Sequence, residues 1–166
     1  MKAQVIEKLG FIFAGIETSI SRENDAFKKE LPAFWVSVMN DENADDLPQK
    51  WQLKPLTGFP EGLHGIMDYK PIGPKKFLYM IGGFSSSPGQ APSHVKVPPQ
   101  RVAIFETEPY SPQDAAKTIQ SLWNKIHDIW LPTEHYTIAE GASLEVYRCK
   151  GNGTMICEVW IPVKQT

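Results

Sequence analysis

The sequence predicts an α+β fold built from two strand–helix–strand–strand repeats. Stretches of strand length, rich in Val, Ile and Phe, alternate with two longer stretches in which apolar residues recur every three or four positions. That spacing is typical of one face of a helix. Each helical stretch follows one strand and precedes two, so the same order of elements occurs twice. The duplication predicts one sheet beneath a pair of helices, with a groove between the halves.

The chain length favours one domain over residues 1–166, because domains of about 100–150 residues are the commonest. We expect the first repeat at about residues 1–84 and the second at about residues 100–166. The segment between them, residues 85–99, is rich in Ser, Pro and Gly and is predicted to be a loop.

The first repeat begins with a long predicted strand over Gln4–Ser21. A helix follows, with an apolar stripe between Phe27 and Met39. Pro32 either kinks this helix or stands at the first position of its main body. Two short strands complete the repeat, at Leu63–Tyr69 and Phe77–Gly82.

The second repeat begins with a predicted strand over Arg101–Glu108. Its helix starts at Ser111, which is a favoured cap and is followed by Pro at the first helical position. We expect the helix to end at Pro132. The repeat closes with a hairpin whose strands, Leu144–Lys150 and Met155–Val163, flank the turn sequence Gly-Asn-Gly.

The register of this hairpin decides which side chains share a face. If Asn152 and Gly153 occupy the two turn positions, Glu145 opposes Trp160 and Tyr147 opposes Glu158, so two carboxylates and two aromatic rings share one face. The other face is then wholly apolar, and a register slip of one residue would break the pairing. The residues predicted for that apolar face are Leu144, Val146, Cys157, Val159 and Ile161.

Glu145 has two interpretations. It is either a solvated carboxylate on an edge strand or a partly buried one among aromatic rings. An unpaired carboxylate is costly to bury, so the second interpretation makes Glu145 a counter-charge for a cationic ligand, with cation–π attraction from the rings. Each ring could instead belong to the ordinary core. The aromatic candidates for the wall of such a site are Trp35, Tyr69, Tyr79, Trp123, Tyr147 and Trp160.

Composition excludes several classes of protein. The formal net charge of −2 and pI of about 6.1 argue against direct nucleic-acid binding. Cys149 and Cys157 are too few for a disulfide framework, and the predicted register places them on opposite faces, so we expect reduced thiols in a cytoplasmic protein. The apolar run Leu9–Ile16 is too short to span a bilayer, and no small-residue cleavage site follows it.

Signatures of metal, cofactor and catalytic sites are weak or missing. The four histidines lack metal-ligand spacing, and there is no P-loop, no GxGxxG and no GxSxG motif. We therefore expect no metal, no cofactor and no catalytic residue. The one catalytic alternative is a carboxyl pair, Glu145 and Glu158, which could do acid–base work if the environment separated their pKa values.

Several segments in chain order resemble a known family. The most specific are Leu-Glu-Val-Tyr at 144–147 and Glu-Val-Trp-Ile-Pro-Val at 158–163. Others are Tyr69, the run 77–83, Val-Pro at 97–98, the strand 101–105 and the stretch from Leu122 to Pro132. On these motifs the chain resembles the GyrI-like, AraC-type effector-binding domains, and most closely the stand-alone integron-associated effector-binding proteins.

The resemblance implies two strand–helix–strand–strand units with pseudo-twofold symmetry, an antiparallel sheet with two helices, and a ligand pocket between the repeats. In drug-binding members, an aromatic pocket carries a Glu on the penultimate strand that meets cationic, lipophilic compounds. That Glu corresponds to Glu145 and the aromatic residue of the terminal strand to Trp160, while Trp123 lies on the helix that also supplies pocket aromatics. Two features depart from the family pattern: the linker 136–141 is not Gly-Tyr-rich, and the sequence contains no helix-turn-helix.

The expected function is that of a small-molecule effector-binding protein for cationic amphipathic compounds, acting in drug sequestration or, through a partner protein, in transcription regulation. Two alternatives stay open: a hydrolase that attacks electrophilic small molecules with Glu145 and Glu158 or Tyr147, and a protein-partner module of the gyrase-inhibitor type. We expect no membrane association, and a protein partner or a homodimer. The expected ligand-binding residues are Glu145, Trp160, Trp123, Tyr147, Tyr79, Tyr69, Trp35 and Glu158.

Overall fold

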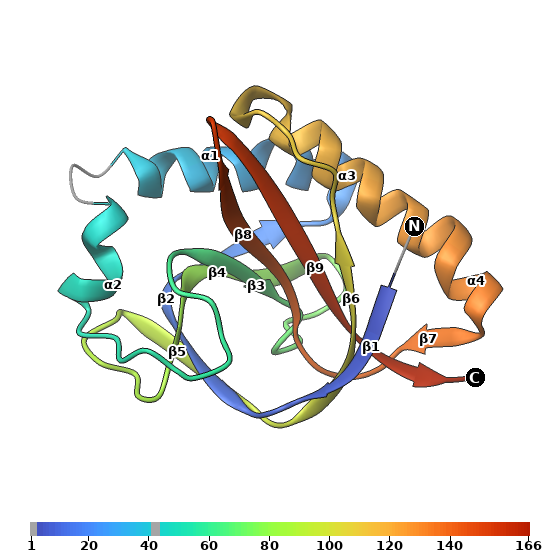
Figure 1. Ribbon diagram of the computed structural model, residues 1–166, viewed down its shortest axis with the longest axis horizontal. Coiled ribbons are helices and arrows are strands. Elements are labelled where there is room, and N and C mark those ends of the chain that lie inside the picture. The colour runs from blue at the N-terminus through green and yellow to red at the C-terminus, as the bar shows by residue number, and fades with distance from the viewer. Residues whose placement is uncertain (1–2, 41–43) are drawn as a thin grey trace. The chain divides into compact units, whose positions relative to one another are not determined.

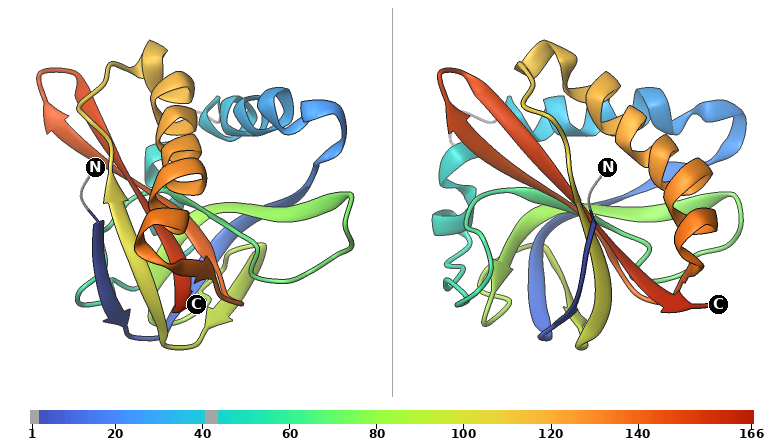
Figure 2. Two further views of the ribbon diagram at one scale, coloured as in Figure 1. Left: turned by 90° about the vertical axis from the view of Figure 1, so that its right-hand side faces the viewer. Right: turned by 45° about the vertical axis from the view of Figure 1, so that its right-hand side comes forward.

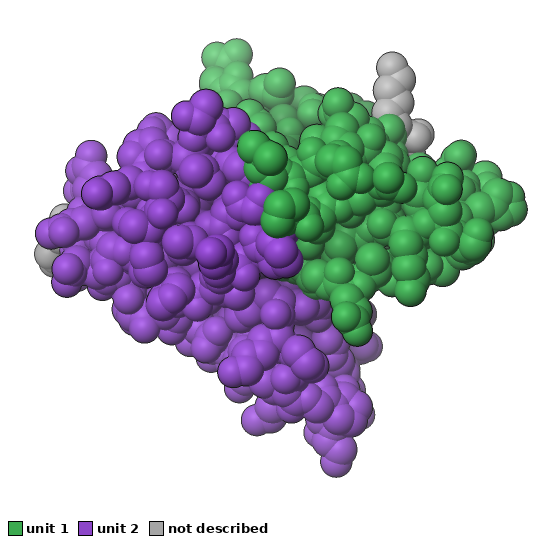
Figure 3. Space-filling view, turned by 90° about the horizontal axis from the view of Figure 1, so that it is seen from below, with its two compact units in different colours: residues 1–9, 99–166 green, residues 10–98 purple. Residues whose placement is uncertain are grey.

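The computed structural model describes residues 3–40 and 44–166 of the chain. The chain folds into two compact units, which Figure 3 colours separately. Unit 1 consists of Met1–Leu9 with Pro99–Thr166, and unit 2 of Gly10–Pro98. Each unit pairs an antiparallel sheet with helices, so the predicted α+β class is confirmed. None of the helices in the described ranges is both long enough and apolar enough to cross a membrane.

Unit 2 contains a four-stranded antiparallel sheet in the order β3-β4-β2-β5. Its strands are β2 (Phe11–Ser21), β3 (His64–Met67), β4 (Lys76–Ser85) and β5 (Ser93–Val97). Its helical segments are η1 (Glu23–Asp25), α1 (Phe27–Met39), η2 (Ala44–Asp46) and α2 (Leu47–Lys50). The helix α1 lies along one face of the sheet (Figure 1), where Val38 packs with Ile20, Phe77 and Ile81 of the strands. Pro32 stands inside this helix, which continues past it.

Unit 1 contains an antiparallel sheet in the order β1-β6-β9-β8, and β7 pairs with β9. Its strands are β1 (Ala3–Lys8), β6 (Gln100–Glu106), β7 (Tyr136–Ile138), β8 (Ser143–Gly151) and β9 (Thr154–Gln165). Its helical segments are η3 (Pro112–Asp114), α3 (Ala115–Lys125), the π-helical η4 (Ile126–Trp130) and α4 (Leu131–Glu134). The last three follow one another as a single rod (Figure 2). Ser111 has extended backbone angles and precedes Pro112, so the predicted helix start is confirmed.

Three predicted elements or boundaries were wrong. The second helix does not end at Pro132, because α4 contains this proline and continues to Glu134. The single strand Gln4–Ser21 is two strands, interrupted at Leu9 and Gly10, and β1 pairs with β6 rather than extending β2. The predicted loop 85–99 contains β5, which pairs with β2. A pattern of apolar residues favours extended backbone but does not identify the partner strand, so it could not show where one strand stops and another begins.

The closing hairpin has the predicted turn but a different register. Asn152 and Gly153 take φ of 53° and 73°, as a two-residue turn requires, and Gly151 pairs with Thr154. A β-bulge between Cys149 and Gly151 then shifts the pairing by one residue. A shift of one residue moves side chains to the opposite face, because strands alternate with a period of two.

Candidate ligand-binding site

The bulge determines which residues accompany Glu145. Glu145 pairs with Val159 and Tyr147 with Cys157, so these four side chains share one face of the sheet. This is the face that α3 covers, because Val159 belongs to the core that Leu122, Ile126 and Trp130 form with the strands. The predicted pairs of Glu145 with Trp160 and of Tyr147 with Glu158 were therefore wrong.

The Glu145 carboxylate lies within this covered face, with only 9% of the residue exposed. Trp123 of α3 donates its indole Nε1–H to Oε2 at 2.9 Å, and the Tyr147 hydroxyl donates to Oε1 at 3.1 Å. Both donors are neutral, so they orient and solvate the carboxylate without cancelling its charge. Of the two interpretations of Glu145, the structure shows the buried one. The side chain is held among aromatic rings.

The aromatic walls of this cluster are partly exposed. The rings of Trp123 and Tyr147 are each of intermediate burial, so the polar cluster reaches the surface of the protein. The Trp123 indole also stacks on the His127 imidazole, with 5.9 Å between ring centroids and 18° between planes. The same indole therefore stacks on His127 and donates its N–H to Glu145.

Tyr110 is a further member of the cluster that sequence reasoning missed. Its backbone N–H and carbonyl both bond Met155, at 2.8 Å each, which joins the loop before α3 to β9. Burial raises the pKa of the Tyr110 phenol, and the neighbouring Cys157 and Glu145 raise it further. The phenol is therefore a neutral donor within electrostatic reach of Glu145. In the sequence, Tyr110 is simply an aromatic residue in a loop, which does not indicate that it lies near Glu145.

Cys157 lies beside these groups as a buried thiol. Burial raises its pKa, the charges of Glu145 and Glu158 raise it further, and its N–H donates to the Thr107 hydroxyl at 2.9 Å. The register places Cys149 on the same face, not the opposite one as predicted, but Cys149 is exposed and both thiols are free.

Trp160 and Glu158 lie on the opposite face of the same sheet. Trp160 Nε1 donates to Glu158 Oε1 at 3.0 Å, and Glu158 Oε2 pairs with the Arg148 guanidinium at 3.3 Å. The Lys8 ammonium lies 4.9 Å from the centroid of a Trp160 ring. This indole therefore already contacts a cation from its own chain.

The remaining predicted site residues belong to unit 2. Trp35 Nε1, on α1, donates to the Tyr79 hydroxyl at 2.9 Å, and the partly buried Trp35 packs against the core cluster that contains Tyr79. Gly65 lies directly under the Tyr79 hydroxyl, where a β-carbon would overlap it. The Tyr69 hydroxyl donates to Glu17 Oε2 at 2.6 Å. The structure thus brings Trp123, Glu145 and Tyr147 together in unit 1, and it places Trp35 with Tyr79 and Tyr69 with Glu17 in unit 2.

Within residues 3–40 and 44–166, no three His, Cys, Asp or Glu side chains are grouped so that they could hold a metal ion.

Comparison with known proteins identifies the family. The family model of the integron-associated effector binding proteins (Cass2) matches residues 4–163. Among solved structures, SAV2435 bound to tetraphenylphosphonium is 18% identical, with a TM-score of 0.73 over 99% of this chain and 94% of that one. The integron cassette protein VCH_CASS2, from the mobile metagenome of Vibrio cholerae, is 18% identical, with a TM-score of 0.54 over 98% and 95%.

At these identities the two structures show a shared fold. None of the curated proteins matches the sequence. The family model spans almost the whole chain, and the resemblance noted in the sequence is confirmed. The chain belongs to the family of integron-associated effector binding proteins.

Proposed function

We propose that the chain binds cationic, lipophilic small molecules at the cluster of Trp123, Tyr147 and Glu145, with Glu145 as the counter-charge. The observation that carries this proposal is a carboxylate, 9% exposed, that accepts hydrogen bonds from the neutral side chains of Trp123 and Tyr147. A carboxylate that keeps its charge in such surroundings attracts a cation more strongly than one in water, because the local dielectric constant is lower.

The rings around this carboxylate favour an organic cation over a simple metal ion. Indole and phenol faces attract a cation by about 0.5–2 kcal/mol each and also bury apolar substituents. A metal ion would instead need several oxygen ligands around it. A bulky lipophilic cation satisfies both the charge and the rings. In support, the structurally similar SAV2435 has been solved bound to tetraphenylphosphonium, a cation of this kind.

Acid–base chemistry by Glu145 with Glu158 is not part of the proposal. The two carboxylates lie on opposite faces of the β8–β9 hairpin and so cannot act on the same bond. Acid–base chemistry by Glu145 with Tyr147, which share a hydrogen bond, stays a prediction that the proposal does not use. Ligand contacts of Trp35, Tyr69, Tyr79, Trp160 and Glu158 stay predictions, as do drug sequestration, regulation through a partner protein, a homodimer and a cytoplasmic location.

Isothermal titration calorimetry with tetraphenylphosphonium tests the proposal. We expect the Glu145→Gln variant to bind the cation about 10- to 100-fold more weakly than the natural sequence, the scale of a lost charged partner. Triphenylphosphine oxide, a neutral compound of similar shape, should bind both proteins equally. Equal affinity of the two proteins for the cation would overturn the proposal.

A second variant controls for the overall charge of the protein. Glu106 is an exposed carboxylate on β6 of the same unit. The Glu106→Gln variant changes the net charge by the same amount as Glu145→Gln, and we expect it to keep the natural affinity for tetraphenylphosphonium. A loss as large as that of Glu145→Gln would show that attraction is a property of the whole surface and not of this site.

A further inference from the structure

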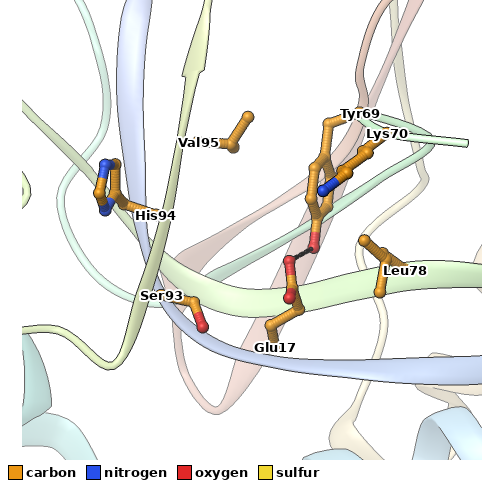
Figure 4. A pocket seen from close by; sticks show the side chains of 7 residues that line it. All are labelled: Glu17, Tyr69, Lys70, Leu78, Ser93, His94 and Val95. Carbon is orange, nitrogen blue, oxygen red and sulfur yellow. Dashed lines mark hydrogen bonds between the residues drawn. The ribbon is translucent and has the colours of Figure 1, made fainter.

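Unit 2 contains a pocket that takes no part in the proposed cation site. Its volume is about 380 Å³, near the lower end of the range of about 300–1,000 Å³ that is usual for small-molecule sites. The residues that line it are Glu17, Tyr69, Lys70, Leu78, Ser93, His94 and Val95. In Figure 4, Tyr69 and Lys70 stand on one side of the pocket, and His94 and Val95 stand on the other.

The pocket lies where β5 stops pairing with β2, so that β2 has an open edge. Strand β5 pairs with β2 only over Phe11–Gly15, so Glu17 comes just beyond the last paired residue. The register places Glu17, Leu78, Ser93 and Val95 on one face of the sheet. The beginning of β5 and the segment after β3 thus form two walls over the open stretch of β2.

Glu17 is oriented within this pocket. Its Oε2 accepts the Tyr69 hydroxyl at 2.6 Å, and burial together with this carboxylate raises the pKa of the phenol, which stays a donor. In the part of the chain that the structure describes, Oε1 of Glu17 accepts no hydrogen bond. One carboxylate oxygen is therefore held by the protein, and the other is available to a ligand.

Two basic side chains, Lys70 and His94, line the same pocket as the Glu17 carboxylate. Over the described residues, the side chains of Lys70 and His94 form neither an ion pair nor a hydrogen bond. Lys70 is positive and Glu17 negative, but the two do not approach within the 4.0 Å of an ion pair. Leu78 and Val95 add aliphatic surface.

This combination selects the class of ligand. The negative charge of Glu17 would repel a simple anion, and the positive charge of Lys70 would repel a simple cation. A molecule that carries both an ammonium and a carboxylate satisfies the two charges together, and an aliphatic body would cover Leu78 and Val95. We propose that this pocket binds a small zwitterion of the α-amino acid type with an apolar side chain, its ammonium on Glu17 and its carboxylate on Lys70.

Titration of the ¹⁵N-labelled protein with L-leucine, followed by amide chemical shifts, tests this proposal. The amides of Glu17, Tyr69, Lys70 and residues 93–95 should shift with one common dissociation constant. Leucine methyl ester lacks the carboxylate and N-acetyl-leucine lacks the ammonium, so each should bind about tenfold or more weakly, the effect of losing one charged hydrogen bond. Absence of shifts at these amides up to the solubility of leucine, or equal affinity for the three compounds, overturns the proposal.

Charge-neutral variants assign the two ends of the ligand. The Glu17→Gln variant should bind leucine and its methyl ester at least tenfold more weakly, and its affinity for N-acetyl-leucine should be unchanged. The Lys70→Gln variant should bind leucine and N-acetyl-leucine more weakly, and its affinity for the methyl ester should be unchanged. Lys96, an exposed residue of β5 that does not line the pocket, gives the matched control Lys96→Gln, which should bind leucine as the natural sequence does. The reverse pattern, or an equal loss in Lys96→Gln, contradicts the assignment. Thermal melting shows whether each variant is folded.

Discussion

The hydrogen bond between Trp123 and Glu145 makes a quantitative prediction about stability. Replacing Trp123 by Phe keeps an aromatic ring but removes the N–H that donates to Oε2 at 2.9 Å. A hydrogen bond to a charged group contributes about 1.5–3 kcal/mol, and one between neutral groups about 0.5–1.5 kcal/mol. Because Glu145 is only 9% exposed, solvent screens the charged bond little, and its contribution should lie within the first range.

A double-mutant cycle separates this bond from the loss of indole packing. Trp123→Phe is made both in the natural sequence and in the Glu145→Gln background, where the acceptor is neutral. The packing loss is common to both backgrounds and cancels. The remaining coupling is the difference between a charged and a neutral hydrogen bond, about 1–1.5 kcal/mol.

Urea unfolding followed by circular dichroism measures the four proteins, since fluorescence would change with the tryptophan itself. At slopes of about 1–3 kcal/mol per molar urea, the expected coupling corresponds to a displacement of the midpoints of about 0.3–1.5 M. A coupling below about 0.5 kcal/mol, the usual deviation from additivity for independent sites, would refute the assignment of a charged, buried hydrogen bond.

Three further predictions follow from burial and backbone geometry. In native protein, iodoacetamide should modify the exposed Cys149 but not the buried Cys157, and mass spectrometry should find the second adduct only in denaturant. Burial raises the pKa of Cys157 above its ordinary value of 9.0, so above pH 9 the unfolded thiol loses its proton while the folded one keeps it. The free energy of unfolding should therefore fall as the pH rises from 9 to 10, and it should fall less in the Cys157→Ala variant. The same dependence of this free energy on pH in both proteins would contradict the prediction. Gly82→Ala should lower the midpoint of thermal unfolding by several degrees, because the new β-carbon would overlap the backbone carbonyl of Ala14. An unchanged midpoint would show that β2 and β4 can move apart there at little cost in free energy.

The local sequence predicted the structural elements that depend on neighbouring residues. The Ser111–Pro112 start of the second helix and the Asn152–Gly153 turn are of this kind, because a proline in the first helical turn and a positive φ act through a few adjacent residues. The family motifs likewise singled out Glu145 before its burial was known. Where the backbone conformation depends on adjacent residues, as at this helix start and this turn, it can be predicted from the sequence.

The composition of the candidate site could be predicted only in part: Trp123 and Tyr147 were expected beside Glu145, but Trp160 was expected there too and Tyr110 was not. The bulge before Gly151 moves Trp160 away from the face of Glu145, and nothing in the alternation of β8 indicates an extra residue. Tyr110 joins the cluster only because its backbone bonds Met155 from a loop. Both depend on contacts between distant parts of the chain.

The sequence by itself therefore determined the α+β class, the repeated order of elements and the family, and it singled out Glu145 as a candidate binding residue. Only the tertiary structure decided that β1 pairs with β6, that Glu145 faces α3 with Trp123 and Tyr147, and that Glu17 and Tyr69 line a pocket of unit 2. The physical reason is that helix periodicity, caps and tight turns depend on local backbone energies. Strand partners, bulges and register are instead selected by packing over a whole sheet, and a shift of one residue changes the face of every side chain beyond it.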